Sequence, residues 1–124
     1  MIKNLWEKTE LYCMNHKEPV RMYIYEHAVS PFYACPRYMR KDADHPDGHE
    51  ENEPGCANRI SFDAYWKIVD KFGEIMEADF ANGEIQDYTG LRFRWKQIDV
   101  KILSYSEKKI LIGVSNRKEI DSWH

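Results

Sequence analysis

The sequence lacks the features that identify several large classes of protein. It has no run approaching about 20 apolar residues, which excludes a transmembrane helix. Residues 1–7 lack the apolar stretch of a signal peptide, so we expect a soluble, cytoplasmic protein with no membrane partner. A Gly-rich phosphate loop, a His-Glu-x-x-His motif and a recognisable pair of nucleophile and base are also missing. These absences predict a protein that is not an enzyme.

Cysteine is scarce, and neither sign of charge dominates. The three cysteines are an odd number without a secretory signal, which argues against a disulfide framework. The formal net charge of −3 is too small to indicate a partner. Apolar material is plentiful, since 43% of the 124 residues are hydrophobic and 14% are aromatic. This length and composition exclude extensive disorder and predict one domain, residues 1–124, with room for a conventional core.

The small net charge conceals a gradient along the chain. Residues 61–90 carry 2 basic and 7 acidic side chains, whereas residues 91–124 carry 8 basic and 4 acidic ones. An acidic middle and a basic end predict two surfaces that attract different partners. Solvated faces that merely differ in sign are the simpler alternative. Residues 41–55 hold 6 acids, 2 prolines and 2 glycines, which predicts an exposed acidic loop.

The cysteines stand in a pattern that indicates a metal site. Cys13 and His16 are separated by two residues, a spacing at which both side chains of a tight turn reach one ion. Cys35 and Cys56 each lie beside turn-forming Pro or Gly residues. Three buried thiols that pack as small apolar groups are the alternative. A Cys3His set forms a closed tetrahedron, so the sequence predicts one structural Zn²⁺ bound by Cys13, His16, Cys35 and Cys56.

Residues 11–60 resemble a zinc ribbon. Residues 20–27 alternate apolar and polar positions, and residues 31–35 form a second short run of strand-forming residues. This pattern predicts a β-hairpin between two ligand turns. The resemblance implies a small module that zinc holds together.

The second ligand turn departs from the ribbon pattern. A ribbon has two ligands a few residues apart at this turn. Here Tyr38 stands where the second ligand is expected, and the next cysteine is Cys56. We interpret residues 37–55, which hold the acidic loop 41–55, as an insertion in that turn.

Other histidines are alternative candidates for the fourth ligand, the position assigned to His16. His27 ends the first strand of the predicted hairpin, and His45 and His49 lie four residues apart in the acidic loop. Either loop histidine would replace His16, or both would form a second, open metal site with nearby carboxylates. A hydrated loop with incidental histidines is the simpler alternative.

An amphipathic helix is predicted over residues 61–83. Ser61 is a favourable N-cap, and Asn82 and Gly83 form a favourable end. Trp66 and Ile68 are expected to widen the apolar face, although an exposed patch is the alternative. That face consists of Phe62, Tyr65, Val69, Phe72, Met76 and Phe80. The opposite face carries Asp63, Asp70, Glu74, Glu77 and Asp79.

Residues 91–115 predict an antiparallel β-hairpin. Leu91, Phe93 and Trp95 alternate with basic residues, and the apolar positions then change parity from Ile98 onward, which predicts a bulge or bend near Gln97. Residues 104–109 form a polar turn, and residues 110–114 return as a strand. The predicted fold class is therefore α+β: a zinc-braced N-terminal hairpin, one central helix and a C-terminal antiparallel sheet.

The hypothesis we favour is a non-enzymatic zinc-binding protein that binds a protein partner. Its small size, acidity and zinc-braced irregular fold resemble the character of small inhibitors from phages and mobile elements, including anti-CRISPR proteins. That resemblance implies a basic nucleic-acid-processing enzyme, of the Cas9 type, as the partner. The residues expected to bind it are Asp70, Glu74 and Glu77 of the helix and Glu50 and Glu51 of the loop.

Two alternatives belong to other functional classes. The first is a zinc-ribbon protein that binds nucleic acid through a basic C-terminal sheet, because such residues contact phosphates. Its candidate residues are Arg92, Arg94, Lys96 and Lys101. The second is a metal-dependent hydrolase that uses His45 and His49, which requires an open coordination position.

Overall fold

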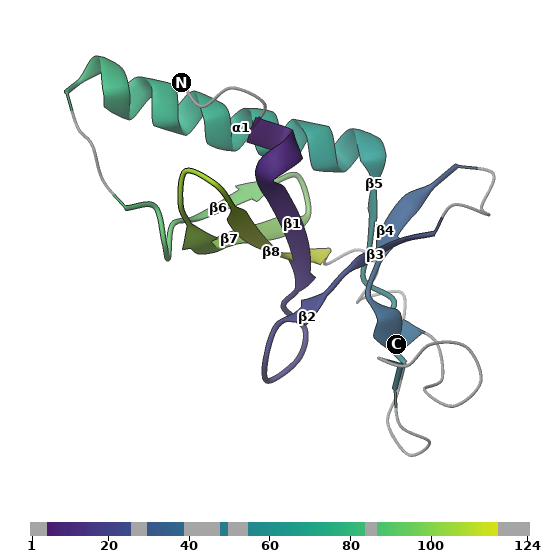
Figure 1. Ribbon diagram of the computed structural model, residues 1–124. Helices are drawn as coiled ribbons and strands as arrows, with labels where there is room; N and C mark the ends of the chain where they lie inside the picture. Colours follow the sequence, from purple (N-terminus) through teal and green to yellow (C-terminus); the bar gives the residue numbers. More distant parts are fainter. Residues whose placement is uncertain (1–4, 26–29, 39–47, 50–54, 84–86, 117–124) are drawn as a thin grey trace.

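The computed structural model describes residues 5–25, 30–38, 48–49, 55–83 and 87–116 (Figure 1). Two 3₁₀ helices, one α-helix and eight strands occur in these ranges. In chain order they are η1 (Leu5–Lys8), β1 (Thr9–Cys13), β2 (Val20–Arg21), β3 (Tyr23–Tyr25), β4 (Phe32–Ala34), η2 (Pro36–Tyr38), β5 (Arg59–Ser61), α1 (Phe62–Ala81), β6 (Arg92–Trp95), β7 (Ile98–Tyr105) and β8 (Ile110–Asn116). None of the described helices combines the length and the apolar character that crossing a membrane requires.

The strands form two sheets, which confirms the predicted α+β class. One sheet has the order β3-β4-β5 and is antiparallel throughout. The other has five strands in the order β2-β1-β8-β7-β6, and its β1 and β8 are parallel. The predicted hairpins are present as β3–β4 and β7–β8. The strand β1 was not predicted, because the sequence analysis treated its end as a ligand turn.

The single strand expected over residues 20–27 is wrong, because the chain changes sheet at Met22. β2 pairs with β1 in the five-stranded sheet, and β3 pairs with β4 in the three-stranded one. Met22 lies between them, with its side chain buried and its backbone N–H donating to Leu11 O at 2.9 Å. Ile24, one of the apolar positions in the alternation over residues 20–27, is 45% exposed. His27 lies outside the described residues.

The helix α1 follows the sequence prediction closely. The Ser61 hydroxyl accepts a hydrogen bond from Ala64 N at 3.1 Å and so caps the first turn. Gly83, with φ of 77°, takes the left-handed conformation that ends the helix. The buried residues end at Met76, so the last turn extends beyond the core and leaves Phe80 62% exposed. Phe80 is therefore wrongly placed on the buried face by the sequence analysis.

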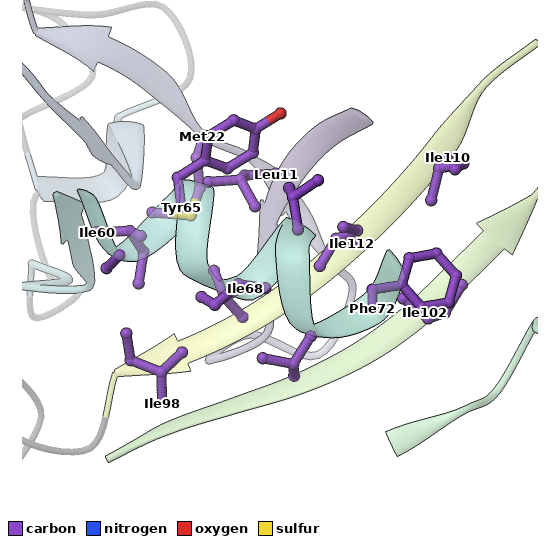
Figure 2. Close-up of a cluster of buried hydrophobic side chains, with 14 of the residues drawn as sticks. Leu11, Met22, Ile60, Tyr65, Ile68, Phe72, Ile98, Ile102, Ile110 and Ile112 are labelled. Atoms are coloured by element: carbon purple, nitrogen blue, oxygen red, sulfur yellow. The ribbon is translucent and has the colours of Figure 1, made fainter. Parts of the chain in front are cut away.

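The main core lies between α1 and the inner face of the five-stranded sheet (Figure 2). Ile68 and Phe72 of α1 are fully buried, whereas Trp66 is 41% exposed, so only Ile68 widens the core face as predicted. Burying an isoleucine or phenylalanine side chain contributes about 1.5–3 kcal/mol. The strand residues that pack against the helix include Ile98, Ile102, Ile110 and Ile112.

The change of parity after Trp95 comes from a turn and not from a bulge. Trp95 pairs with Ile98, so Lys96 and Gln97 form the two-residue connection between β6 and β7. Lys96 has φ of 53°, which a tight hairpin of this kind requires. An irregularity of register lies further on, between Ile102 and Ser104. The polar turn before β8 is confirmed, with the Ser106 hydroxyl hydrogen-bonded to the backbone of Lys109.

Candidate metal centre

The four predicted ligands come together at one end of the three-stranded sheet. Cys13 ends β1, His16 lies in the turn that follows, Cys35 follows β4, and Cys56 precedes β5. Their ligand atoms all lie within 4.8 Å of one another. The three cysteines are buried and His16 is partly exposed. Residues far apart in the sequence thus form one compact Cys3His group.

The spacing of the donor atoms matches a tetrahedral zinc site. With a Zn–S bond of about 2.3 Å, two sulfurs of a regular tetrahedron are about 3.8 Å apart. Cys13 Sγ lies 3.7 Å from Cys56 Sγ, and His16 Nε2 lies 3.2 Å from Cys35 Sγ. The first distance also exceeds the roughly 2.05 Å of a disulfide, and all three cysteines are free thiols. The group fits a metal ion better than a covalent bridge.

Backbone hydrogen bonds hold the ligand turns in place. Cys35 N donates to Asn58 O at 3.1 Å, and Cys56 N donates to Arg37 O at 3.0 Å. The second bond brings the two ends of segment 37–55 together, as expected of an insertion within one ligand turn. On the other side, Met14 N donates to Val114 O at 3.1 Å, which fixes the start of the Cys13–His16 turn on β8. The group therefore rests on both sheets.

Asn58 connects the candidate ligands with the five-stranded sheet, and the sequence analysis missed it. It is fully buried, and its Nδ2 donates to Cys13 Sγ at 3.1 Å and to Val114 O at 3.0 Å. Its Oδ1 accepts from Asn116 N at 3.0 Å. Such hydrogen bonds orient metal ligands from outside the coordination shell. The available signal was a polar residue between a cysteine and a buried strand, which alone does not indicate this role.

Asn15 forms a second link of the same kind. Its Nδ2 donates to Cys56 Sγ at 3.8 Å, and its Oδ1 accepts from the Ser115 hydroxyl at 2.6 Å. A nearby N–H donor stabilises the negative charge of a thiolate ligand. Two asparagine side chains thus reach the sulfurs, and both are tied to the end of β8.

The three thiols differ in how readily they lose a proton. Hydrogen bonds from Cys13 and Cys35 hold the pKa of Cys56 well below its usual value. For Cys13 the hydrogen bond with Cys35 acts to lower the pKa, but the hydrogen bond with Cys56 and burial outweigh it and raise the pKa to about 11. The pKa of Cys35 is raised by its hydrogen bonds with the other two thiols and by burial. A bound cation would lower the raised pKa values of Cys13 and Cys35 and so favour their thiolates.

Of the rival histidines, His49 lies within the described residues, and it does not join the group. His49 lies against Gly55, next to Cys56 in sequence, but it is not among the four residues whose donor atoms converge. His45 lies outside the described residues, and so do Glu50 and Glu51 of the predicted partner-binding loop. The Cys13–His16 pair therefore supplies two of the converging donors, as the spacing predicted.

The other candidate residues lie on two surfaces. Asp70, Glu74 and Glu77 are exposed on α1. Lys96 lies in the β6–β7 turn with its ammonium group 4.7 Å from the centre of the Trp95 ring. The remaining basic candidates, Arg92, Arg94 and Lys101, line one hollow on the five-stranded sheet.

Comparisons with protein-family models, with curated proteins and with solved structures gave no match to this chain. The interpretation of the site consequently rests on the donor atoms, their distances and their hydrogen bonds. Of these, the convergence of three sulfurs and one imidazole nitrogen is the most specific.

Proposed function

We propose that this chain is a zinc-binding protein in which Cys13, His16, Cys35 and Cys56 hold one structural Zn²⁺. The observation that carries the proposal is the convergence of these four donor atoms within 4.8 Å. Three sulfurs and one imidazole nitrogen form a typical ligand set for structural zinc, and harder cations such as Mg²⁺ prefer oxygen. A bound Zn²⁺ would supply the positive charge that three neighbouring thiolates require.

The role of the ion follows from what it would connect. Its ligands come from the end of β1 and the turn after it, from the residue that follows β4, and from the segment before β5. Structural zinc contributes an apparent binding free energy of about 10–16 kcal/mol at neutral pH. The ion would therefore act as a cross-link between the three-stranded sheet and the first strand of the five-stranded sheet.

A closed site supports a structural role. Four protein ligands leave no coordination position for water or substrate, whereas a catalytic zinc keeps one open. The metal-dependent hydrolase would depend on a second site at His45 and His49. That hypothesis, and the prediction that the chain is not an enzyme, both stay predictions.

Binding of a protein partner also stays a prediction. The acids Asp70, Glu74 and Glu77 are exposed on α1, as that hypothesis requires, but an exposed acidic face is typical of solvated helices in general. The inhibitor role rests on resemblance of character alone. Reversal of the three charges, followed by identification of co-purifying proteins, would test it.

The experiment for the zinc proposal uses the full chain purified without chelator. We expect about one zinc per chain by elemental analysis, and a Co²⁺-substituted protein should show the absorption of a tetrahedral thiolate complex. The His16→Ala variant should lose most of its zinc, and the matched control His49→Ala should keep it. Zinc well below one per chain in the unaltered protein, or equal loss in both variants, would overturn the proposal.

A further inference from the structure

The face of the five-stranded sheet that points away from α1 carries a row of basic and aromatic side chains. Ile98, Val100 and Ile102 of β7 face the core, so the alternating residues Asp99 and Lys101 point to the other side. In Figure 1, α1 covers one face of this sheet. The alternation along the strands and their pairing place the row on the opposite face. This second face is called the outer face below.

One line of paired residues crosses the whole outer face. Arg92 pairs with Lys101, Lys101 with Gly113, Gly113 with Tyr12, and Tyr12 with Arg21. Strands in a sheet are about 4.8 Å apart, so the four steps span about 19 Å. The line thus has cations at both ends and an aromatic ring between them.

A hollow of about 580 Å³ lies at the β6 end of this line. The thioether of Met14, which lines the hollow, lies over Gly113 and occupies the place that a side chain at position 113 would need. The polar or flexible side chains that line the hollow are Met14, Arg92, Arg94, Asp99, Lys101 and Ser115.

Two of the three cations in this hollow have no acidic partner among the described residues. Arg92 and Lys101 lie directly opposite each other, and neither has an ion-pair or side-chain hydrogen-bond partner within the part of the chain that the structure describes. Like charges in directly opposed positions destabilise a sheet. An anion between them would remove that repulsion.

Arg94 is the third cation of the hollow, and one hydrogen bond to Asp99 orients its side chain. Asp99 accepts a hydrogen bond from Arg94 Nε at 2.7 Å, so the terminal nitrogens of the guanidinium carry the remaining donors. A guanidinium with one edge held by a carboxylate presents its other edge to a phosphate in a defined geometry.

The charge of the outer face differs from that of the helix. Five basic side chains lie there: Arg21, Arg92, Arg94, Lys101 and Lys109. Glu10 pairs with Arg21 at 3.6 Å and with Lys109 at 3.3 Å, and Asp99 pairs with Arg94 at 2.7 Å, so the two acids leave an excess of positive charge on this face. By contrast, α1 carries five acids and two lysines. The opposite signs on opposite faces would orient a negatively charged polymer toward the outer face.

We infer that the outer face binds the phosphate backbone of a single-stranded nucleic acid. Arg92 and Lys101 contact phosphates in the hollow, Arg21 contacts one at the far end, and the Tyr12 ring supports a base between them. Single-stranded nucleic acids bind to positively charged grooves with aromatic side chains of this kind. A line of about 19 Å across all five strands suits a polymer with repeated charges better than a single small anion.

The test measures binding of fluorescent oligo(dT) and oligo(U), each of about 15 nucleotides, with inorganic phosphate as a competitor. The zinc-loaded full chain is titrated between about 50 and 200 mM salt. The double variant Arg92→Gln with Lys101→Gln removes two positive charges. The exposed Lys67→Glu variant on α1 changes the net charge by the same amount and is the matched control.

Loss of two phosphate contacts should reduce the steepness of the salt dependence by about 1.4 on a log–log scale. We expect the double variant to bind at least about tenfold more weakly at low salt, with Lys67→Glu little changed. Melting temperatures and zinc content of both variants should match the unaltered protein. No binding of either oligonucleotide at low salt, equal weakening in both variants, or competition by phosphate at concentrations that match a single-anion site would overturn the inference. A zinc-loaded chain that binds no oligonucleotide would leave the zinc proposal intact.

Discussion

The two sheets of this protein differ in what holds them together. The five-stranded sheet packs isoleucine and valine side chains from β7 and β8 against α1, and most of these are fully buried. The three strands of the other sheet have three residues each, and Ala34 and Ile60 are their buried side chains. Three short strands with so little buried area are unstable alone. The comparison leads us to expect that the candidate metal ligands take the place of a core where the chain is too short to form one.

Removal of zinc tests this comparison most severely. We expect a strong chelator to unfold the three-stranded part, because the ion contributes about 10–16 kcal/mol of apparent binding free energy. Hydrogen exchange should accelerate in β3, β4 and β5, whereas β7 and β8 keep much of their protection. Equal acceleration in both sheets would show that the two halves are one cooperative unit.

The opposite perturbation removes a side chain from the core. Phe72 is fully buried between α1 and the five-stranded sheet, so Phe72→Ala should lower the free energy of unfolding by about 3–5 kcal/mol. Chemical denaturation measures this value. Phe80→Ala on the same helix is the control and should change stability by less than about 0.5 kcal/mol, since Phe80 is exposed. Equal effects at both positions would contradict the packing described for α1.

Asn58 connects the candidate metal ligands with the five-stranded sheet, and its replacement should affect both. Asn58→Ala leaves the buried Asn116 N without its partner, at a cost of about 1–3 kcal/mol in stability, and removes one of the hydrogen bonds that Val114 O accepts, while the bond from Met14 N remains. It also removes the hydrogen bond to Cys13 Sγ, which should weaken zinc affinity about 10–100-fold. Competition with a chromophoric chelator measures the affinity. Asn82→Ala at the exposed end of α1 should leave zinc affinity unchanged; a matching loss there would refute the link.

The smallest expected effect concerns the junction between the sheets and the helix. Ser61 ends β5 and caps α1, so Ser61→Ala should cost about 1 kcal/mol, measured as a lower melting temperature. Ser104→Ala, at an exposed position of β7, provides the comparison and should be nearly neutral. A neutral Ser61→Ala would mean that the cap contributes nothing once β5 is held by its neighbours.

Local patterns predicted those features that neighbouring residues determine. The cap at Ser61, the end at Gly83 and the pairing of Cys13 with His16 all depend on residues a few positions apart. Pairing of β1 with β8 depends on residues about a hundred positions apart, and no local signal in residues 9–13 shows it. The parity change after Trp95 predicted a bulge or a bend near Gln97, and only the pairing of Trp95 with Ile98 shows that the chain makes a tight turn there.

The ligands of the candidate site could be predicted from the sequence, but the residues that hydrogen-bond to those ligands could not. Cysteine and histidine are the usual ligands of structural zinc, so three cysteines and a suitably spaced histidine in a short chain indicate a candidate metal site. Asparagine is common in loops, and only burial shows that Asn58 serves the site. The same holds for the outer face, where Arg21 and Lys101 belong to one row because of strand order and not because of their spacing in sequence.

The parallel pairing of β1 with β8 has a consequence for the order of assembly during synthesis. Thr9 pairs with Ile110, so β1 lacks this neighbour until about a hundred further residues have left the ribosome. All four candidate ligands lie between residues 13 and 56, and they are available long before that. The candidate ligand set is thus complete before the larger sheet can close, and an early-bound ion would keep β1 in position for a strand that arrives late.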